Sequence, residues 1–481
     1  MLFSSLLFLY CFLPFVLLGN ILIQQRYRNK FLLIASLVFF AWGGVTFTFI
    51  FMGSVLMNYY CGILISNYGN NIKRKNIVLT IAIIINIAFL CIFKYSGFVI
   101  ENINLLFHDI GLHQIPSIRI VLPIGISFYT FHELSYIIDV YRGTTKAQRK
   151  LADLGLYISF FPQLIAGPII RYKDIAEQLN NREFSYASFN NGIYRFLLGL
   201  GKKVLIANTL AVLADHAFNT APGEINMTMA WLGIISYTFQ IYFDFSGYSD
   251  MAIGLALIFG FRFKENFNFP YLAESIKDFW RRWHISLSTW FRDYLYIPLG
   301  GNREGEGKTY RNLIIVFFVT GLWHGASWNF ILWGFCHGMF IVIETLGFGI
   351  ILEKLFRPLR IMYSYIIVLF AWVMFRADNI TYAAQYYKVM LGMGKTSANF
   401  LQTIQNETEK EQILVLIIAI AGSFGLFKYV SKFIAYLRSK NSLSILNGID
   451  VVRFAFSICM LIICTIYLIS GTYNPFIYFR F

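Results

Sequence analysis

Long stretches without charge restrict most strongly what this chain can become. No Asp, Glu, Lys or Arg occurs in residues 1–25, 31–72, 76–93, 312–343 or 454–479. About 20 apolar residues suffice to cross the hydrocarbon core of a bilayer, so the windows 31–72 and 312–343 are each long enough for a hairpin of two spans. Only 14% of the chain is charged, against about 25% in soluble domains. The sequence therefore predicts an integral membrane protein.

Shorter apolar stretches raise the expected number of spans. They lie near residues 120–140, 154–170, 189–214, 225–243, 246–261, 361–375 and 412–430. Because a helix satisfies its own backbone hydrogen bonds in lipid, we expect an all-α polytopic protein with roughly 10–12 transmembrane helices. We expect one membrane domain over residues 1–481, with peripheral spans at 1–119, a catalytic core at 120–345 and C-terminal spans at 346–481. Residues 1–25 lack a basic start and a small-residue cleavage site, which predicts a retained first helix.

The basic residues predict the orientation of the chain. The net charge is +15, and polytopic proteins concentrate Lys and Arg in cytoplasmic loops, so no nucleic-acid partner is expected. Three basic loops stand out along the first part of the chain: Arg26, Arg28 and Lys30; Lys73, Arg74 and Lys75; and Arg142, Lys146, Arg149 and Lys150. With a hairpin broken at Gly43-Gly44, all three loops face the same side if the N-terminus is extracytoplasmic.

Several motifs that would indicate metal or nucleotide chemistry are incomplete. None of the six cysteines has C-x-x-C spacing, so neither a disulfide framework nor a thiolate metal site is predicted. The run GGNREGEGKT has Asn302 where a phosphate-binding loop requires glycine, and His132-Glu133 is followed by Tyr136 where a zinc protease needs its second histidine. The sequence therefore predicts no metal site.

An aromatic and basic stretch holds the first candidate site residue. From about Ser275, apolar residues recur at intervals of three and four, which predicts one amphipathic helix that lies in the membrane interface or re-enters the bilayer. His284 falls at the edge of its apolar face, where a histidine taken alone is more often a packed structural residue. Arg281, Arg282 and Arg292 lie on the polar face, where arginine faces water or anionic groups.

The second candidate, His324, lies near the centre of the uncharged window 312–343. Gly321 and Gly325 flank it and permit the close approach of another backbone or of a substrate. A buried, neutral imidazole can take a proton from a hydroxyl group, as acyl transfer requires. The structural alternative is a hydrogen bond between helices.

Two carboxylates form a third polar group within an apolar region. Asp244 and Asp250 interrupt the double span expected between residues 225 and 261. Two interpretations remain open: they orient a histidine or an arginine, or they mark an extracytoplasmic turn between two helices.

Four stretches occur in an order that resembles a known family: LPIGISFYTF (122–131), FFPQLIAGPIIRY (160–172), DFWRRWHISLSTWFRDYLYIPLGGNR (278–303) and GLWHGASWNFILWGFCHG (321–338). Together with the closing NPFIYFRF, they are similar to the membrane-bound O-acyltransferase family. The resemblance is greatest to the bacterial branch with the alginate and peptidoglycan O-acetylation membrane subunits. It implies a ring of helices around a membrane-crossing funnel, with His324 as the catalytic histidine and His284 as the second. It also implies that the aromatic and basic helix lines a cytoplasmic entrance for the acyl donor, where Arg281, Arg282 and Arg292 suit an anionic coenzyme and equally suit interfacial anchoring.

The resemblance also implies an activity. A multi-pass protein of the bacterial cytoplasmic (inner) membrane would move acetyl groups from acetyl-CoA, or a related thioester, to a cell-surface polysaccharide. The lipid bilayer and an extracytoplasmic acetyltransferase would be its partners, acetyl-CoA is expected as a substrate, and no permanently bound cofactor is expected. Residue usage typical of an AT-rich genome favours peptidoglycan over an alginate-like exopolysaccharide. The alternatives are D-alanyl transfer to teichoic acid and a non-enzymatic transporter or flippase, for which inverted repeats are typical.

Overall fold

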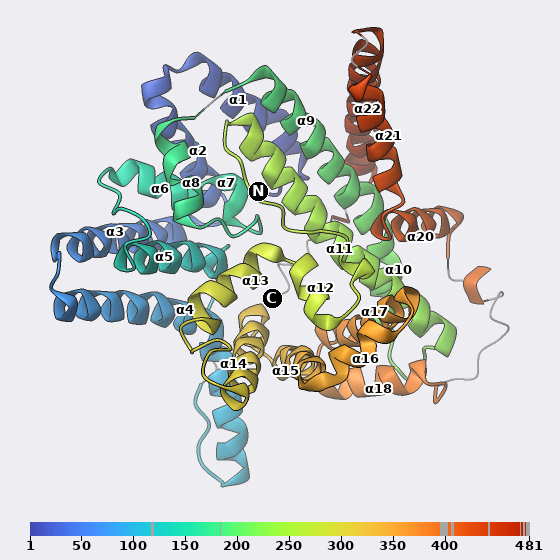
Figure 1. Ribbon diagram of the computed structural model, residues 1–481. Helices are drawn as coiled ribbons and strands as arrows, with labels where there is room; N and C mark the ends of the chain where they lie inside the picture. The colour runs from blue at the N-terminus through green and yellow to red at the C-terminus, as the bar shows by residue number, and fades with distance from the viewer. Residues whose placement is uncertain are drawn as a thin grey trace. The chain divides into compact units, whose positions relative to one another are not determined.

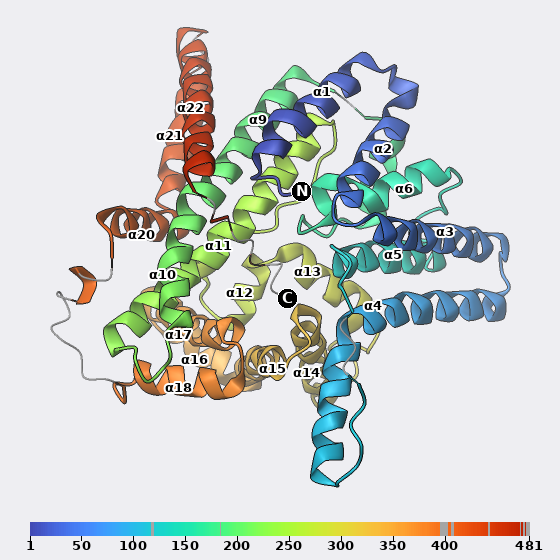
Figure 2. The same ribbon diagram turned by 180° about the vertical axis from the view of Figure 1, so that it is seen from behind.

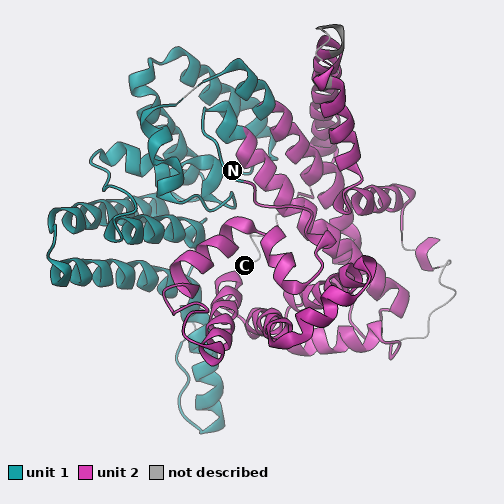
Figure 3. Ribbon diagram, viewed as in Figure 1, with its two compact units in different colours: residues 1–192, 255–264 teal, residues 193–254, 265–481 magenta. Residues whose placement is uncertain are grey.

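The computed structural model describes residues 1–116, 120–182, 184–394, 403–405, 408–440, 443–471, 473, 474 and 477. Every regular element in these residues is a helix, which confirms the predicted all-α class. The chain forms two compact units (Figure 3): unit 1 comprises residues 1–192 and 255–264, and unit 2 comprises residues 193–254 and 265–481. Of the closing NPFIYFRF, all but Asn474 and Ile477 lies outside the described residues.

Unit 1 is built from apolar helical hairpins. Its helices are α1 (Leu13–Leu22), α2 (Arg28–Ala41), α3 (Val45–Asn67), α4 (Ile72–Asp109), α5 (Ile126–Tyr141), α6 (Leu151–Ser159), α7 (Phe161–Leu164), α8 (Tyr172–Asn180) and the start of α9 (Tyr186–Gly201), with short helical turns at Phe8–Phe12 and Gln25–Tyr27. The α2–α3 hairpin turns at Gly43 and Gly44, as predicted, and Gly44 has a φ of 145° that only glycine adopts readily. Helices α3 and α5 lie side by side with part of α4 in both views (Figures 1 and 2).

Unit 2 contains the region of the candidate site residues. Its helices are the end of α9, α10 (Asn208–Asn219), α11 (Met227–Ile258, whose last residues belong to unit 1), α12 (Ile276–Arg282), α13 (Ile285–Phe291), α14 (Glu306–His324), α15 (Trp328–Ile343), α16 (Gly349–Lys354), α17 (Arg357–Arg376), α18 (Ile380–Met390), α20 (Lys410–Ser423), α21 (Phe427–Ser439) and α22 (Leu443–Ser470), with short helical segments at Lys202–Ala207, Pro270–Leu272, Arg292–Tyr296 and Glu344–Phe348. Helices α14 and α15 form the hairpin that the window 312–343 predicts.

The number of helices that could cross a membrane is smaller than the sequence windows indicate. Six described helices are long and apolar enough, or seven if the bent pair of α20 and α21 forms one span. Two windows, 120–140 and 154–170, instead hold α5 and α6, with 16 and 9 residues, whereas a full span needs about 20. The structure retains the predicted multi-pass architecture, and the predicted ring around a funnel stays a prediction.

The region expected as a double span forms one helix. α11 runs without a break from Met227 to Ile258, so Asp244 and Asp250 lie inside it and not in a turn. The turn was inferred because carboxylates are costly among apolar residues. The structure meets this cost with cations from a different part of the chain.

Candidate active site

His324 lies where the α14–α15 hairpin turns. It is the last residue of α14, and Gly325 after it adopts extended backbone with φ −172° and ψ 151°. The residue is 5% exposed. The rings of Trp323, Trp333 and Phe375 surround it, at centroid distances of 4.7, 4.9 and 5.1 Å. Such apolar surroundings disfavour a charged imidazole.

Two glycines bring the backbones of α14 and α15 into contact next to His324. A methyl group at Gly321 would overlap the carbonyl oxygen of Phe330, and one at Gly334 would overlap the carbonyl oxygen of Phe317. The close approach predicted at Gly321 is therefore confirmed, and the approaching group is the backbone of α15. Gly334 supplies the reciprocal contact and was not singled out from the sequence.

His284 interrupts the helix that the sequence predicts from Ser275. α12 ends at Arg282, α13 begins at Ile285, and His284 between them has φ 44° and ψ 55°. A non-glycine residue in this left-handed region costs about 1–3 kcal/mol, so its surroundings must hold the backbone in place. The prediction of one continuous helix was wrong because the periodicity of apolar residues does not record a local break.

Asn266 provides the contacts that hold His284. Its Oδ1 lies 3.2 Å from His284 Nδ1 and accepts hydrogen bonds from the backbone N–H and the hydroxyl of Ser286. Its Nδ2 donates to Ser249 Oγ, and its carbonyl accepts from the N–H of Ile285 at 2.9 Å. Since an amide oxygen only accepts, the Nδ1 of His284 carries the proton and Nε2 presents a lone pair. Sequence reasoning missed Asn266 because its partner lies 18 residues away.

The imidazole of His284 is fully buried and uncharged. Its exposed fraction is 0%, and burial lowers its pKa to about 3. Its Nε2 has no hydrogen-bond partner among the described residues. A neutral ring with an unused acceptor nitrogen can receive a proton or hold a hydroxyl group.

Trp323 connects the two histidines that the sequence singled out. Its ring centroid lies 6.0 Å from His284 and 4.7 Å from His324. On its other side, His284 meets the edge of Phe245 at 4.6 Å. The structure thus brings both candidate residues into one buried site of unit 2, and their catalytic roles stay predictions.

A third histidine, His337, reaches this site from α15. It is fully buried, and its ring lies 5.0 Å from Trp333 and 5.3 Å from Trp280. Neither ring nitrogen has a hydrogen-bond partner in the described part of the chain. Its spacing of four residues from Trp333 places both on one helix face, which is the signal that could have found it. We refer to His284, His324 and His337 as the histidine cluster.

The three arginines expected at the donor entrance have other surroundings. Arg282 binds Asp278 at 2.8 Å, and Arg292 binds Asp293 at 2.7 Å. Arg281 is exposed. Interfacial anchoring, the alternative weighed from the sequence, fits these positions well, and binding of an anionic donor by these residues stays a prediction.

Asp244 forms a buried ion pair. Its carboxylate lies 2.7 Å from the Nζ of Lys203, and the two side chains are 2% and 3% exposed. Its Oδ2 also accepts a hydrogen bond from the backbone N–H of Ile477 at 2.9 Å. The pair of Lys203 and Asp244 therefore links the segment Lys202–Ala207 to α11, and Asp244 also binds the backbone of Ile477.

Asp250 lies two turns further along α11 and binds two cations. Arg195 approaches it at 2.8 Å and Lys202 at 2.6 Å, while Arg195 also binds Glu265. The interpretation that the carboxylates orient a histidine or an arginine is therefore confirmed for Asp250, which binds Arg195, whereas Asp244 binds a lysine. We refer to these charged residues together as the charge network: Arg195, Lys202, Lys203, Asp244, Asp250 and Glu265.

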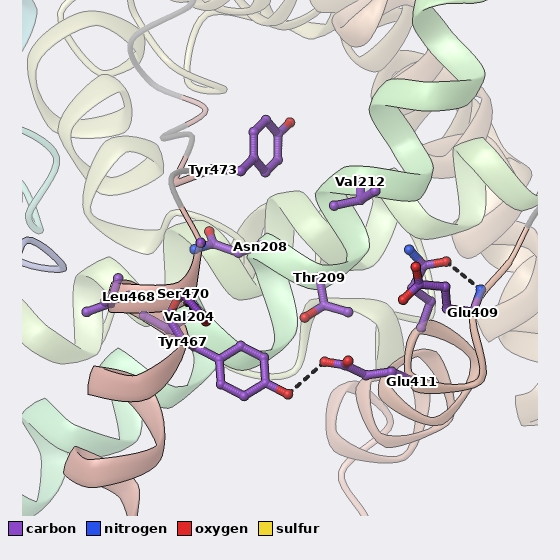
Figure 4. A pocket seen from close by; sticks show the side chains of 12 residues that line it. Val204, Asn208, Thr209, Val212, Glu409, Glu411, Tyr467, Leu468, Ser470 and Tyr473 are labelled. Carbon is purple, nitrogen blue, oxygen red and sulfur yellow. Dashed lines mark hydrogen bonds between the residues drawn. The ribbon is translucent and has the colours of Figure 1, made fainter.

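Unit 2 also contains a cavity of about 250 Å³ that has an acidic lining (Figure 4). Glu411 accepts a hydrogen bond from the hydroxyl of Tyr467 at 2.8 Å, and Glu409 lies beside it. No histidine lines this cavity. Because like charges repel, its lining does not suit a phosphate-bearing acyl donor.

Known proteins with similar sequences cover the whole chain. The sequence model of the membrane-bound O-acyltransferase family matches residues 149–384. The chain is 43% identical to the probable alginate O-acetylase AlgI of Pseudomonas putida, and the match covers all of both chains. The chain belongs to the membrane-bound O-acyltransferase family. It is therefore an acyltransferase of the membrane, as the motifs predict.

Other relatives of this O-acyltransferase have names that indicate different acceptors. The peptidoglycan O-acetyltransferase of Helicobacter pylori is 34% identical over all of this chain and 98% of its own. The teichoic acid D-alanyltransferase of Bacillus subtilis is 31% identical over 47% of this chain and 59% of its own. These identities do not support the preference for peptidoglycan that we drew from residue usage.

The range that matches the membrane-bound O-acyltransferase family contains the whole histidine cluster and Asn266. It also contains the charge network, in which Lys203 and Asp244 are buried. Buried charges and buried imidazoles are costly among apolar residues, so each of these groups needs a structural or chemical reason to be there.

Proposed function

We propose that this O-acyltransferase moves an acetyl group from a cytoplasmic thioester, acetyl-CoA, across the bacterial cytoplasmic membrane for the O-acetylation of a polysaccharide outside it. The observation that carries the proposal is the buried site in which His284 and His324 both contact Trp323. Full-length identity of 43% to a probable alginate O-acetylase, against 34% to a peptidoglycan O-acetyltransferase, supports an alginate-like polymer as the acceptor.

Acyl transfer from a thioester to a hydroxyl group requires a proton acceptor in a site from which water is excluded. As the oxygen of the acceptor hydroxyl bonds to the thioester carbonyl carbon, the hydroxyl proton passes to an imidazole; the C–S bond then breaks, and the leaving thiolate takes this proton from the imidazolium. The family resemblance gives the role of base to His324. The Nδ1 of His284 is bonded to Asn266, and its Nε2 has no partner among the described residues. In this proposal, Nε2 would position the second reacting group by a hydrogen bond. The surrounding indole rings would keep out water, which would hydrolyse the thioester.

Export of the acetyl group calls for a second protein in this proposal. An extracytoplasmic acetyltransferase would receive the group and pass it to the polymer, and the N-terminus of the chain would lie on that side of the membrane. The alginate-like acceptor, the donor and this partner are tested together by one assay.

The assay uses the full-length protein in lipid vesicles with acetyl-CoA that carries a radiolabelled acetyl group. Coenzyme release and label on an added acetyltransferase partner or on added polysaccharide are followed for wild type, His324→Ala and His284→Ala. We expect His324→Ala to lose about 10²–10⁴-fold in the rate of release, the usual contribution of general base catalysis. His284→Ala is expected to lose less, since its proposed role is to position a group.

A matched control removes a histidine far from any buried ring. His108→Ala, whose side chain is 75% exposed, should release coenzyme at the wild-type rate. Label on a uronic acid polymer and not on peptidoglycan fragments would support the alginate-like acceptor, and the reverse would contradict it. Folded wild-type protein that turns over no thioester would sink the proposed function.

A further inference from the structure

Unit 1 contains a second and larger cavity, of about 550 Å³. We refer to it as the basic cavity; its lining includes Arg26, Arg28, Asn29, Lys30, Lys150, Asp153 and Arg182. Its volume lies within the range of about 300–1,000 Å³ found for small-molecule sites. It belongs to unit 1, whereas the histidine cluster belongs to unit 2.

The lining of the basic cavity has a large excess of positive charge. It contains five cationic side chains and one carboxylate, that of Asp153. Asp153 is 5% exposed, and its Oδ1 accepts a hydrogen bond from Asn29 Nδ2 at 2.7 Å. Among the described residues, no carboxylate lies within ion-pair distance of any of the five cations. The excess charge is therefore not neutralised within the protein.

Two helix N-termini add to this positive field. α2 begins at Arg28 and α6 begins at Leu151, and both first turns line the cavity. The residues before them, Tyr27 and Lys150, provide no side-chain cap. The first amides of a helix carry a partial positive charge and need acceptors. Helix N-termini that lie next to basic side chains in a cavity bind phosphate in many proteins.

Arg182 is held in position with a donor still unused. Its Nη2 donates to Asn29 Oδ1, and its guanidinium lies 4.5 Å from the ring centroid of Phe261. Burial and the nearby charge of Arg28 lower its pKa to about 10, so it remains charged at neutral pH. Its Nη1 is buried and has no hydrogen-bond partner among the described residues. A ligand oxygen could supply that partner after a small rotation of the guanidinium.

We propose that the basic cavity binds a phosphate-bearing ligand. Arg26, Arg28, Lys30 and Lys150 come from two of the loops that the sequence predicts on the cytoplasmic side, so the ligand would enter from there. Two sources offer this chemistry: the headgroup of an anionic phospholipid and the phosphates of a free coenzyme. The proposal does not depend on the roles of the histidines.

The test measures binding to the full-length protein and not its activity. Protein in nanodiscs of phosphatidylcholine, with or without phosphatidylglycerol, is examined by native mass spectrometry for retained anionic lipid. Coenzyme A and inorganic phosphate are titrated calorimetrically into the phosphatidylcholine discs. The double variant Arg28→Gln/Arg182→Gln should weaken the binding of at least one probe by about tenfold per cation removed, because hydrogen bonds to charged groups contribute that much.

The matched control is Lys73→Gln/Arg74→Gln, which removes two exposed cations from another predicted cytoplasmic loop and should bind as the wild type does. If the double variant does not fold, Arg26→Gln/Lys30→Gln replaces two exposed cations of the same lining and should weaken binding in the same direction. Loss of phosphatidylglycerol alone identifies a lipid site, and loss of coenzyme A alone identifies a coenzyme site. Equal binding by variants and wild type, equal loss in the control, or no binding of any probe to wild type would overturn the proposal.

Discussion

The charge network and the histidine cluster both lie in unit 2, but their polar atoms are satisfied in different ways. Every carboxylate of the network pairs with a cation at 2.5 to 2.8 Å. In the cluster, the imidazoles lie among indole and phenyl rings, and nitrogens of His284 and His337 have no partner within the described residues. Native proteins rarely leave buried polar atoms unpaired without a reason. The contrast agrees with a structural role for the charge network and with the proposed role of the histidine cluster in catalysis.

The largest loss of stability is expected from the variant Lys203→Met in the charge network. It leaves the carboxylate of Asp244 buried without its cation, which should destabilise the protein by about 3–5 kcal/mol. Thermal unfolding in detergent, followed by fluorescence-detected size exclusion, measures the loss. The variant Lys203→Met/Asp244→Asn should recover much of the stability because it removes both charges.

The control for this prediction is Lys308→Met. Lys308 pairs with Glu304 at 2.8 Å, but both side chains are about half exposed, and such pairs contribute about 0–1 kcal/mol. If Lys203→Met and Lys308→Met shifted the unfolding temperature equally, the charge network would not have the structural role that we assign to it.

A smaller loss of stability is expected when the contact between α14 and α15 beside the histidine cluster is disturbed. In Gly334→Ala the new methyl group overlaps the carbonyl oxygen of Phe317, so α14 and α15 must separate, at a cost of about 1–3 kcal/mol. Because the neighbouring Trp333 packs against His324, the rate of coenzyme release should fall as well. The measurements are thermal unfolding and the acetyl-CoA assay.

Gly53→Ala is the matched control for Gly334→Ala, because Gly53 also lies in a helix but has open space around it. No atom lies within 4 Å of a methyl group at this position in α3, and alanine favours a helix over glycine by about 1 kcal/mol. This variant should be as active and as stable as the wild type, or slightly more stable. A comparable loss in both variants would show that the contact between α14 and α15 has no special role.

The last effect is gradual and concerns pH and the neutral ring of His284. Its folded pKa of about 3 lies below its ordinary value of 6.5, so between these values the unfolded chain binds more protons. Stability from the neutral ring is therefore complete above pH 6.5 and falls by about 1.4 kcal/mol for each pH unit below it, until pH 3. Unfolding of wild type and His284→Asn should be compared from pH 7 to pH 5.

Asparagine is the chosen substitute because it tolerates the left-handed backbone better than most residues. The stability difference between wild type and His284→Asn should shrink as the pH falls, since the variant has no ring to protonate. Parallel curves would mean that His284 is not held neutral, and the distinction between the two regions would be weaker.

The sequence alone predicted the elements that lipid exposure controls. The uncharged windows 31–72 and 312–343 each form a hairpin that turns at glycine, because the absence of charge directly reflects contact with apolar surroundings. The same reasoning failed at α11, where Asp244 and Asp250 suggested a turn. Their cations lie some forty or more residues away in the chain, and no local pattern records such a pairing.

The candidate site was predictable as a pair of residues but not as a geometry. Motif resemblance singled out His284 and His324, and the structure brings both to Trp323. The left-handed backbone of His284 depends on Asn266, a tertiary contact that periodicity does not contain. His337 was not singled out because the rings of Phe279 and Trp280 beside it belong to α12, more than fifty residues earlier in the chain.

Glu344 has a consequence for how the chain matures during synthesis. Its two carboxylate oxygens accept hydrogen bonds from the N–H groups of Ile276 and Lys277, at 2.6 and 3.0 Å, and so satisfy the start of α12. The amide of Ile276 precedes its acceptor by 68 residues. At about 5–20 residues per second of ribosomal elongation, α12 waits roughly 3–14 seconds for this acceptor to be made. The start of α12, a few residues before His284, therefore lacks this acceptor until Glu344 has been made.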